Sequence, residues 1–167
     1  MSLSSTLKVS ISSTQTEDLD LSTPSDGLND NNSTSLADGT GADQANKQWH
    51  DSRSLSSGAS EDLDMSGTLE DAFGGSVIFS AIKAISIRNT STDSTLIVGG
   101  ATAAITSLFA DTTDKLIVRP GGRVYFEAPD VDGYAVTAGS ADDLKMEHGA
   151  EGSSDLVYEI IVIGVSS

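Results

Sequence analysis

The sequence predicts an all-β protein, an antiparallel β-sandwich of jelly-roll type with an extended N-terminal arm. Three observations favour this class. The 167-residue chain is 37% hydrophobic but only 5% aromatic, and its aliphatic residues alternate with polar ones in short runs, as in half-buried strands. Ser, Thr, Gly, Asn and Asp are abundant, and these residues favour turns over helices. Turn clusters recur about every 8–12 residues, a spacing typical of sandwiches and barrels.

Residues 1–48 are expected to form N-terminal strands and an extended arm. This region would belong to the same domain as the rest of the chain or would pack on a neighbouring molecule. Aliphatic and polar side chains alternate over residues 7–11, which predicts a strand, and residues 19–21 predict a second, shorter one. Residues 23–41 have few apolar side chains and are expected to form a long loop, an extended arm or a disordered segment.

Residues 49–167 are expected to form the sandwich core. A strand over residues 46–55 should carry Trp49, the only tryptophan, into the core or an interface. Residues 77–87 and 156–165 are apolar on both faces, which is typical of strands inside a sandwich, and the second is expected to be central. Further strands are expected at residues 63–65, 96–98, 115–118, 123–128, 134–137 and 144–146, and a short helix or an irregular loop at 101–110.

Charge and composition narrow the range of partners. The chain has 25 acidic and 9 basic residues, a net charge of −16, which disfavours binding to nucleic acid and to anionic membranes. It has no cysteine, so disulfides and thiolate metal sites are excluded. Neither a signal peptide nor a membrane span is expected, because the N-terminal segment lacks a basic start and residues 160–165 form only a short apolar run.

One segment contains residue types found in hydrolase active sites. His50 and Asp51 lie beside Ser52 and Arg53, but a triad requires groups that meet in space, and no Gly-x-Ser-x-Gly nucleophile motif is present. A polar strand edge is the simpler interpretation. His148 is the only other histidine, so a histidine-rich metal site is not expected. The sequence therefore predicts no enzyme, no catalytic residue and no cofactor.

Acidic turns offer the remaining candidate ligands. Residues 130–133 resemble the start of a calcium-binding loop, but no glutamate closes it six residues after the glycine. We interpret this segment as a turn. A loosely bound cation at Asp142 and Asp143, or at Glu61 and Asp62, is an alternative, and no metal site is assigned.

Several segments together resemble a group of small structural proteins encoded among the virion genes of tailed bacteriophages. The resemblance covers nearly the whole chain and consists of turn and strand signatures rather than catalytic motifs. It implies a β-sandwich and a place in the virion, and it supplies no catalytic residues. The segments are GTGADQA (39–45), WHDSRSL (49–55), EDLDMSGTLEDAFG (61–74), VRPGG (118–122), GYAVTAG (133–139) and VYEIIVIG (157–164).

The resemblance leads us to expect a capsid decoration, or cement, protein. Such a protein would bind the outer head shell and stabilise it, as a homotrimer or another homo-oligomer. It would contact the major capsid protein or other virion subunits, after assembly in the host bacterial cytoplasm. An arm of residues 1–48 could add a strand to a neighbouring sheet. The alternative is a tail component, either a tube subunit or a host-recognition (receptor-binding) tip protein.

Overall fold

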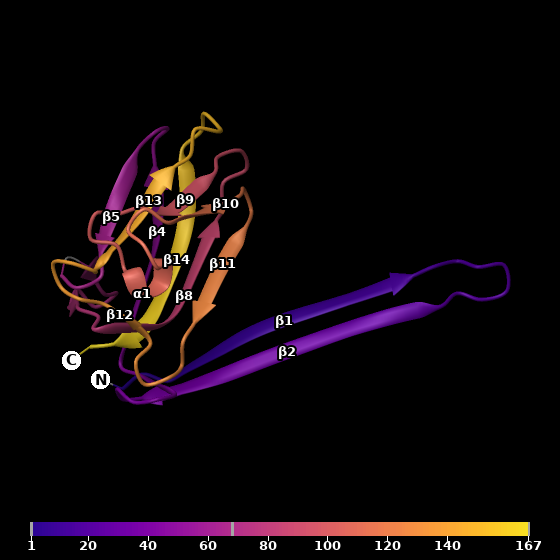
Figure 1. Ribbon diagram of the computed structural model, residues 1–167, viewed down its shortest axis with the longest axis horizontal. Helices are drawn as coiled ribbons and strands as arrows, with labels where there is room; N and C mark the ends of the chain where they lie inside the picture. Colours follow the sequence, from indigo (N-terminus) through magenta and orange to yellow (C-terminus); the bar gives the residue numbers. More distant parts are fainter. Residues whose placement is uncertain (1, 68, 167) are drawn as a thin grey trace.

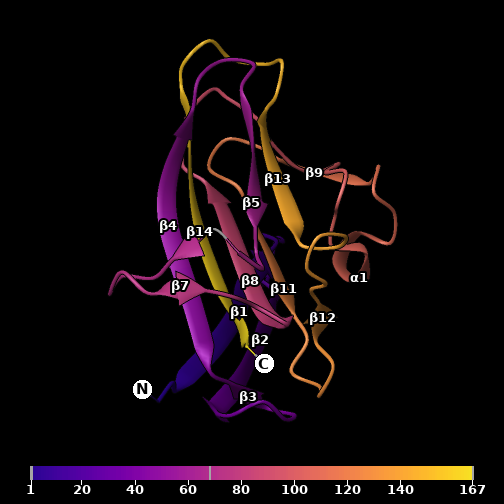
Figure 2. The same ribbon diagram turned by 90° about the vertical axis from the view of Figure 1, so that its left-hand side faces the viewer.

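Two antiparallel sheets form the body of the protein in a computed structural model that describes residues 2–67 and 69–166 (Figures 1 and 2). The larger sheet has the order β11 (Arg123–Glu127), β8 (Ala81–Asn89), β14 (Leu156–Val165) and β4 (Lys47–Leu55), and β12 (Tyr134–Ala135) also pairs with β8. The smaller sheet has the order β10 (Lys115–Val118), β9 (Leu96–Gly99), β13 (Asp143–His148) and β5 (Ser60–Asp64). The predictions of an all-β chain and of a sandwich-like body are confirmed.

The hydrophobic core lies between these two sheets. Alternate side chains of β14 are completely buried, as the period of two of a strand requires when one face is covered. Burial of each large aliphatic side chain contributes about 1.5–3 kcal/mol, so the alternation itself stabilises the face-to-face packing. The largest contributors from the two sheets are Ile82, Ile85, Ile87, Leu96, Val98, Leu144, Met146, Leu156, Tyr158, Ile160 and Val162.

Two of the strongest strand predictions are confirmed, and a third needs correction. The predicted central strand is β14, which lies between β8 and β4, and β4 carries Trp49 into the core at 3% exposure. The strand predicted over residues 77–87 is interrupted. β7 (Ser76–Val77) covers only the first residue of this range and pairs with β6 (Leu69–Glu70). The next strand, β8, begins at Ala81. Between them, the Phe79 amide donates to the Met65 carbonyl, so the backbone leaves the extended path.

The N-terminal region forms a long β-hairpin that projects from the body (Figure 1). β1 (Ser5–Thr16) and β2 (Ser25–Asp38) pair along their full length, from Ser5 opposite Leu36 to Thr16 opposite Ser25. The prediction of a strand at residues 19–21 is wrong, because these residues lie in the connecting loop. Of the alternatives for residues 23–41, the structure shows the extended arm, because residues 25–38 form β2; a loop or a disordered segment is wrong for them. Backbone pairing with β1, rather than apolar content, makes β2 a strand.

The only helix in the described residues is α1 (Thr106–Phe109), a single turn within the segment where a short helix was expected. It places Phe109 against the core cluster, at 7% exposure. No helix in residues 2–67 and 69–166 is both long enough and apolar enough to cross a membrane.

Candidate assembly interface

The hairpin, which we call the arm (residues 5–38), has one aliphatic and one polar face. Residues opposite each other in an antiparallel pair share a face. The register pairs Val9 with Asn32, Ile11 with Asp30 and Ser13 with Leu28, so every leucine, isoleucine and valine of the two strands falls on the same side. The opposite side carries Ser, Thr, Asn, Gly and Lys8. We call the side with the leucine, isoleucine and valine residues the aliphatic face; it carries Leu7, Val9, Ile11, Leu28 and Leu36, and also the polar residues Ser13, Asp30, Asn32 and Thr34.

Exposure along this aliphatic face increases away from the body. Leu36 at the base is only 2% exposed, whereas Val9 is 39% exposed, Ile11 54% and Leu28 55%. A two-stranded hairpin with no third strand or helix against it is at best marginally stable in water. The far part of the arm therefore presents an aliphatic surface that nothing in its own chain covers.

The base of the arm is fixed to the body by backbone pairing. β2 continues into a parallel pair with β3 (Gln44–Ala45), in which Ala37 lies opposite Gln44. The Asp43 amide donates to the Pro129 carbonyl at 2.7 Å, and the Asn46 amide donates to the Gly164 carbonyl at 3.1 Å. These bonds fix the direction in which the arm leaves the body, and this direction keeps its far half away from its own sheets (Figure 1).

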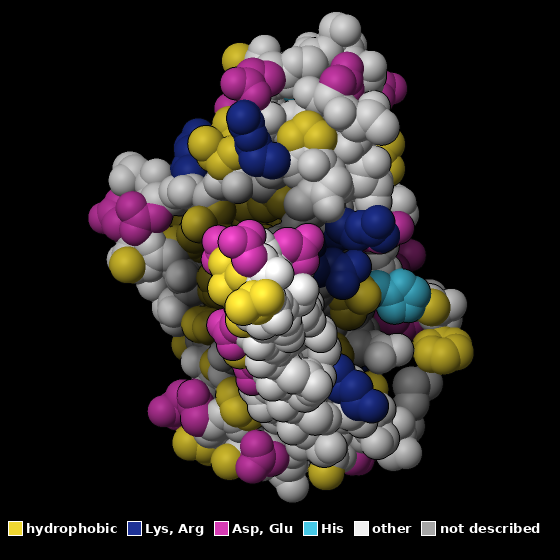
Figure 3. All heavy atoms as spheres, turned by 90° about the vertical axis from the view of Figure 1, so that its right-hand side faces the viewer, with side chains coloured by type: hydrophobic (Ala, Val, Ile, Leu, Met, Phe, Trp, Pro, Cys, Tyr) yellow, Lys and Arg dark blue, Asp and Glu magenta, His cyan; other side chains and the backbone are white. Residues whose placement is uncertain are grey.

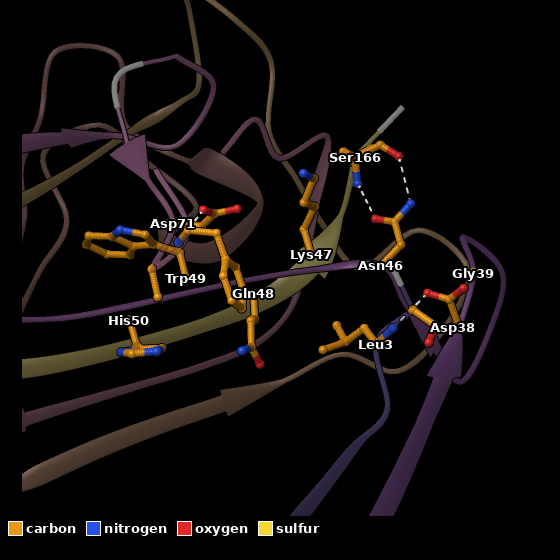
Figure 4. A pocket seen from close by; sticks show the side chains of 13 residues that line it. Leu3, Asp38, Gly39, Asn46, Lys47, Gln48, Trp49, His50, Asp71 and Ser166 are labelled. Atoms are coloured by element: carbon orange, nitrogen blue, oxygen red, sulfur yellow. Dashed lines mark hydrogen bonds between the residues drawn. The ribbon is translucent and has the colours of Figure 1, made fainter. Parts of the chain in front are cut away.

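A pocket of about 600 Å³ lies beside this junction (Figure 4). Two hydrogen bonds cross its lining: the Leu3 amide donates to Asp38 Oδ1 at 3.0 Å, and the Ser166 amide donates to Asn46 Oδ1 at 2.8 Å. Trp49 contributes to the wall but is buried in the body. Within the described residues, no buried side-chain nitrogen or oxygen lacks a hydrogen-bond partner. The pocket thus lies where the arm joins the body.

The outer face of the larger sheet is the second uncovered surface. Val157 and Ile161 of β14 are 37% and 49% exposed, and Ile163 beside them is half-buried. Arg88 on β8 and Arg123 on β11 border this aliphatic strip, since both lie on the same face as Ile161. We call the set Arg88, Arg123, Val157, Ile161 and Ile163 the outer sheet face.

An open cleft of about 550 Å³ separates the base of the arm from this outer sheet face. Leu7 and Val9 line it on the arm side, and Ile161, Ile163 and Tyr125 line it on the sheet side. Tyr125 donates to Glu127 at 2.7 Å. The pKa of the Tyr125 hydroxyl is raised, mainly by its burial and to a lesser extent by this hydrogen bond. The cleft thus has aliphatic side chains on both walls, with Lys8 and Arg123 also in its lining, and it is open to the solvent.

At one side edge of the body, a hydrogen-bonded network joins the two sheets. Tyr158 of β14 donates to Glu61 Oε1 at 2.8 Å, and Arg53 of β4 donates to Glu61 Oε2 through Nε at 2.8 Å and through a terminal nitrogen at 2.6 Å. The hydrogen bond to Glu61 raises the pKa of the Arg53 guanidinium, against the opposing effect of burial. Arg53 also pairs with Asp51 at 2.8 Å. Two residues considered for chemistry, Asp51 and Arg53, therefore have structural partners.

The side chains of His50 and Ser52, the other two residues of the candidate segment, lie away from those of Asp51 and Arg53. Strand alternation in β4 puts His50 and Ser52 on the outer side of the sheet, whereas Asp51 and Arg53 share the opposite side with Trp49. The neighbours in sequence are thus separated by the sheet itself, and His50 is not oriented by Asp51.

The acidic residues considered as cation ligands also have local hydrogen-bond partners. Asp130 Oδ1 accepts from the amides of Asp132 and Gly133, both at 2.8 Å, and buried Lys83 donates to the carbonyls of Asp130 and Val131. A lysine ammonium thus takes the place beneath this turn where a cation would bind.

The second acidic candidate lies at the start of β13. Asp142 accepts from Ser66 Oγ at 2.7 Å and from the Gly139 amide at 2.6 Å. Burial and the charges of Asp142, Asp62 and Asp64 raise the pKa of the Asp143 carboxyl. In the described part of the chain, no group of three or more Asp, Glu or His residues is arranged to hold a metal ion.

His148, on β13, is buried between two carbonyl oxygens. Its Nδ1 lies 2.6 Å from the Gly149 oxygen, and its Nε2 lies 3.0 Å from the Ser154 oxygen. Both carbonyls can accept a hydrogen bond only when both ring nitrogens carry protons. The bond to the Ser154 carbonyl raises the pKa of His148, burial opposes it, and the Gly149 carbonyl and Asp93 add to the increase. The fold therefore favours the imidazolium form.

This geometry predicts a pH-dependent stability. Since the folded-state pKa lies above the unfolded value of about 6.5, the stabilisation is complete below that pH and is lost as the pH rises through the folded-state pKa. Urea unfolding of the wild type should show a midpoint that falls between pH 6 and pH 8.5 more steeply than that of His148→Gln, which cannot titrate. Parallel pH profiles of the two proteins would contradict the assignment.

Comparison with known proteins adds no family to these observations. No protein-family model matches the chain, and no curated protein matches it in sequence. The arm and the outer sheet face are therefore interpreted from their own geometry. Sequence analysis found the strand at residues 7–11 but missed the aliphatic face, because Leu28 joins Val9 and Ile11 only through the register of the hairpin.

Proposed function

We propose that this protein is a structural subunit of a tailed-phage virion, a decoration protein that binds the outer head shell and stabilises it. The observation that carries the proposal is the arm: a long, rigidly attached hairpin with an uncovered aliphatic face. Such a feature has no use in an isolated molecule, where it exposes apolar surface and costs stability. In an assembly, the same surface is buried against a neighbouring subunit.

The order of the strands supports a jelly-roll body. Apart from the two-residue strand β12, the strands of the two main sheets, taken along the chain, pair first with eighth (β4 and β14), second with seventh (β5 and β13), third with sixth (β8 and β11) and fourth with fifth (β9 and β10). This nesting is that of a long hairpin rolled into two sheets, an arrangement found in viral capsid domains. The support is by analogy of fold, and the functional argument depends on the arm.

The charge of the chain is compatible with this role. A net charge of −16 keeps the protein soluble at high concentration. Subunits joined through their arms would contact a shell at several points. Such multivalent binding exceeds the affinity of one contact by orders of magnitude. The partners proposed are the major capsid protein and further copies of this chain, as a trimer or another closed oligomer.

Shortening the arm tests this function. Residues 9–32 are replaced by Asn-Gly, a two-residue hairpin turn that joins Lys8 to its register partner Ser33. Leu36 and the attachment to the body are retained. We expect a folded body whose binding to expanded empty heads, measured by co-sedimentation, falls at least about tenfold because multivalency is lost. Wild-type binding by the shortened protein would contradict the proposal.

A tail tube subunit is the second candidate. The observation that favours it is the reach of the arm, since a 12-residue strand spans about 40 Å and could link neighbours around a ring. Electron microscopy of the purified protein separates the two candidates. Rings that form without heads favour the tube, and coated heads favour decoration. Binding to host cells instead would favour a host-recognition tip.

A further inference from the structure

We propose that the aliphatic face of the arm packs on the outer sheet face of a second copy of this chain. The proposal rests on the structural role proposed above and names the partner of the arm. It differs from strand addition, because the arm already pairs with itself and offers a side-chain face rather than a single strand. Its own outer sheet face is out of reach of the far half of the arm, because the bonds at the base direct the arm away from the body (Figure 1).

The two surfaces match in character and size. Val9, Ile11 and Leu28 on the arm are between 39% and 55% exposed, and Val157 and Ile161 on the sheet are 37% and 49% exposed. The 12-residue strand β1 and the 10-residue strand β14 extend to about 40 Å and about 33 Å, so an arm can cover a whole sheet face. Ile161 and Ile163 face Leu7 and Val9 of their own arm across the open cleft, so an incoming arm would enter beside the base of the resident arm.

Arg123 is the group of the outer sheet face that suits an acidic arm, because Glu127 and Glu159 share this face and Glu159 already pairs with Arg88. Between residues 9 and 35, the arm carries five acidic residues and no lysine or arginine, and acidic side chains gather at its free end (Figure 3). Asp30 lies on the aliphatic face, directly opposite Ile11. On the sheet, Arg88 pairs with Glu159 at 3.6 Å, and Arg123 has no carboxylate within 4.0 Å among the described residues. A docked arm would bring carboxylates to Arg123.

The net charge also limits where on a second copy the arm can bind. A chain with 25 acidic and 9 basic residues meets electrostatic repulsion from most surfaces of its own copies. The arm is therefore directed to the part of the outer sheet face where aliphatic side chains lie beside Arg123, since Arg88 is already paired with Glu159. Binding at this one position fixes the relative orientation of two copies. If the copies close into a ring, or if two copies exchange arms, every arm is buried.

Matched variants of the full-length chain test the arm. Val9→Asp/Ile11→Asp adds two charges to the aliphatic face, and Ser10→Asp/Ser12→Asp adds the same two charges to the polar face of the same strand. We expect the wild type and the polar-face control to sediment as oligomers at tens of micromolar. The aliphatic-face variant should associate at least about a hundredfold more weakly.

A second matched pair tests the sheet. Ile161→Asp lies on the outer sheet face, whereas Ile117→Asp makes the same change at an exposed position (67%) of the smaller sheet. Only Ile161→Asp should dissociate the oligomer, and unfolding followed by the fluorescence of Trp49 should show that both bodies are folded. A monomeric wild type, or an oligomer indifferent to both aliphatic-face and sheet-face charges, overturns the proposal.

Measuring the binding of the same variants to empty heads distinguishes failure of this proposal from failure of the proposed function. An oligomer with the expected variant pattern that ignores heads supports the docking and contradicts the decoration role. A monomer that coats heads contradicts the docking and leaves the decoration role intact. If that monomer loses head binding through Val9→Asp/Ile11→Asp, the arm binds the shell protein, and the second-copy proposal is wrong.

Discussion

Tyr158→Ala should lower the free energy of unfolding by about 3–5 kcal/mol, the range for removal of a large buried aromatic side chain. Tyr158 is completely buried in the central strand β14. Its ring fills the space between the sheets, and its hydroxyl reaches Glu61 of the opposite sheet at 2.8 Å. Burial, followed by this hydrogen bond, raises the pKa of the hydroxyl, so it remains a donor. The substitution removes packing and the cross-sheet bond together.

Tyr158→Phe separates these two contributions. The ring stays and only the hydroxyl is lost, so we expect a loss of about 1 kcal/mol. Urea unfolding followed by the fluorescence of Trp49 measures both variants, because Trp49 is the only tryptophan and is buried. Equal losses for Ala and Phe would show that the hydroxyl, rather than the ring, holds the sheets together.

Gly164→Ala should cost about 3 kcal/mol or more, as overpacking against rigid atoms does. Gly164 lies at the irregularity in the pairing of β14 with β8. A Cβ there would press against the Ala81 carbonyl oxygen and would lie 2.9 Å from the Phe79 ring and 3.2 Å from the Ile82 Cα. Two of these three contacts are backbone atoms, which cannot rotate away. The glycine is required because two strands and Phe79 converge on it.

Gly27→Ala is the matched control. Gly27 is also a strand glycine, but no atom lies within 4 Å of the position its Cβ would take. We expect a change within about 0.5 kcal/mol. The same urea experiment checks the pair, and a Gly164→Ala protein as stable as Gly27→Ala would mean that the backbone around Ala81 gives way.

The sequence predicted most accurately those strands whose signal is local. Residues 156–165 were predicted as a central strand from apolar side chains on both faces, and β14 has these bounds. Trp49 was predicted to be buried by a strand over residues 46–55, and β4 does so. In both cases, side chains two residues apart point to the same face of the strand, so their polarity predicts which face is buried in the core.

Prediction failed where a strand is defined by its partner. Residues 23–41 are polar, and composition left a loop, an extended arm and a disordered segment open without predicting a strand. In the structure, residues 25–38 are β2, because backbone bonds to β1 do not depend on apolar side chains. Residues 19–21 alternate like a strand but lie in the loop at the tip, where no partner is available.

By itself, the sequence determined that the protein is built from strands, that its core is aliphatic, and that its surface is strongly acidic, because these properties depend on composition and on neighbours two residues apart. Only the tertiary structure decided that Val9, Ile11 and Leu28 share one face of a projecting arm and that His50 and Asp51 lie on opposite sides of a sheet. Both depend on which distant segments pair and in what register, since a shift of one residue moves every side chain to the other face.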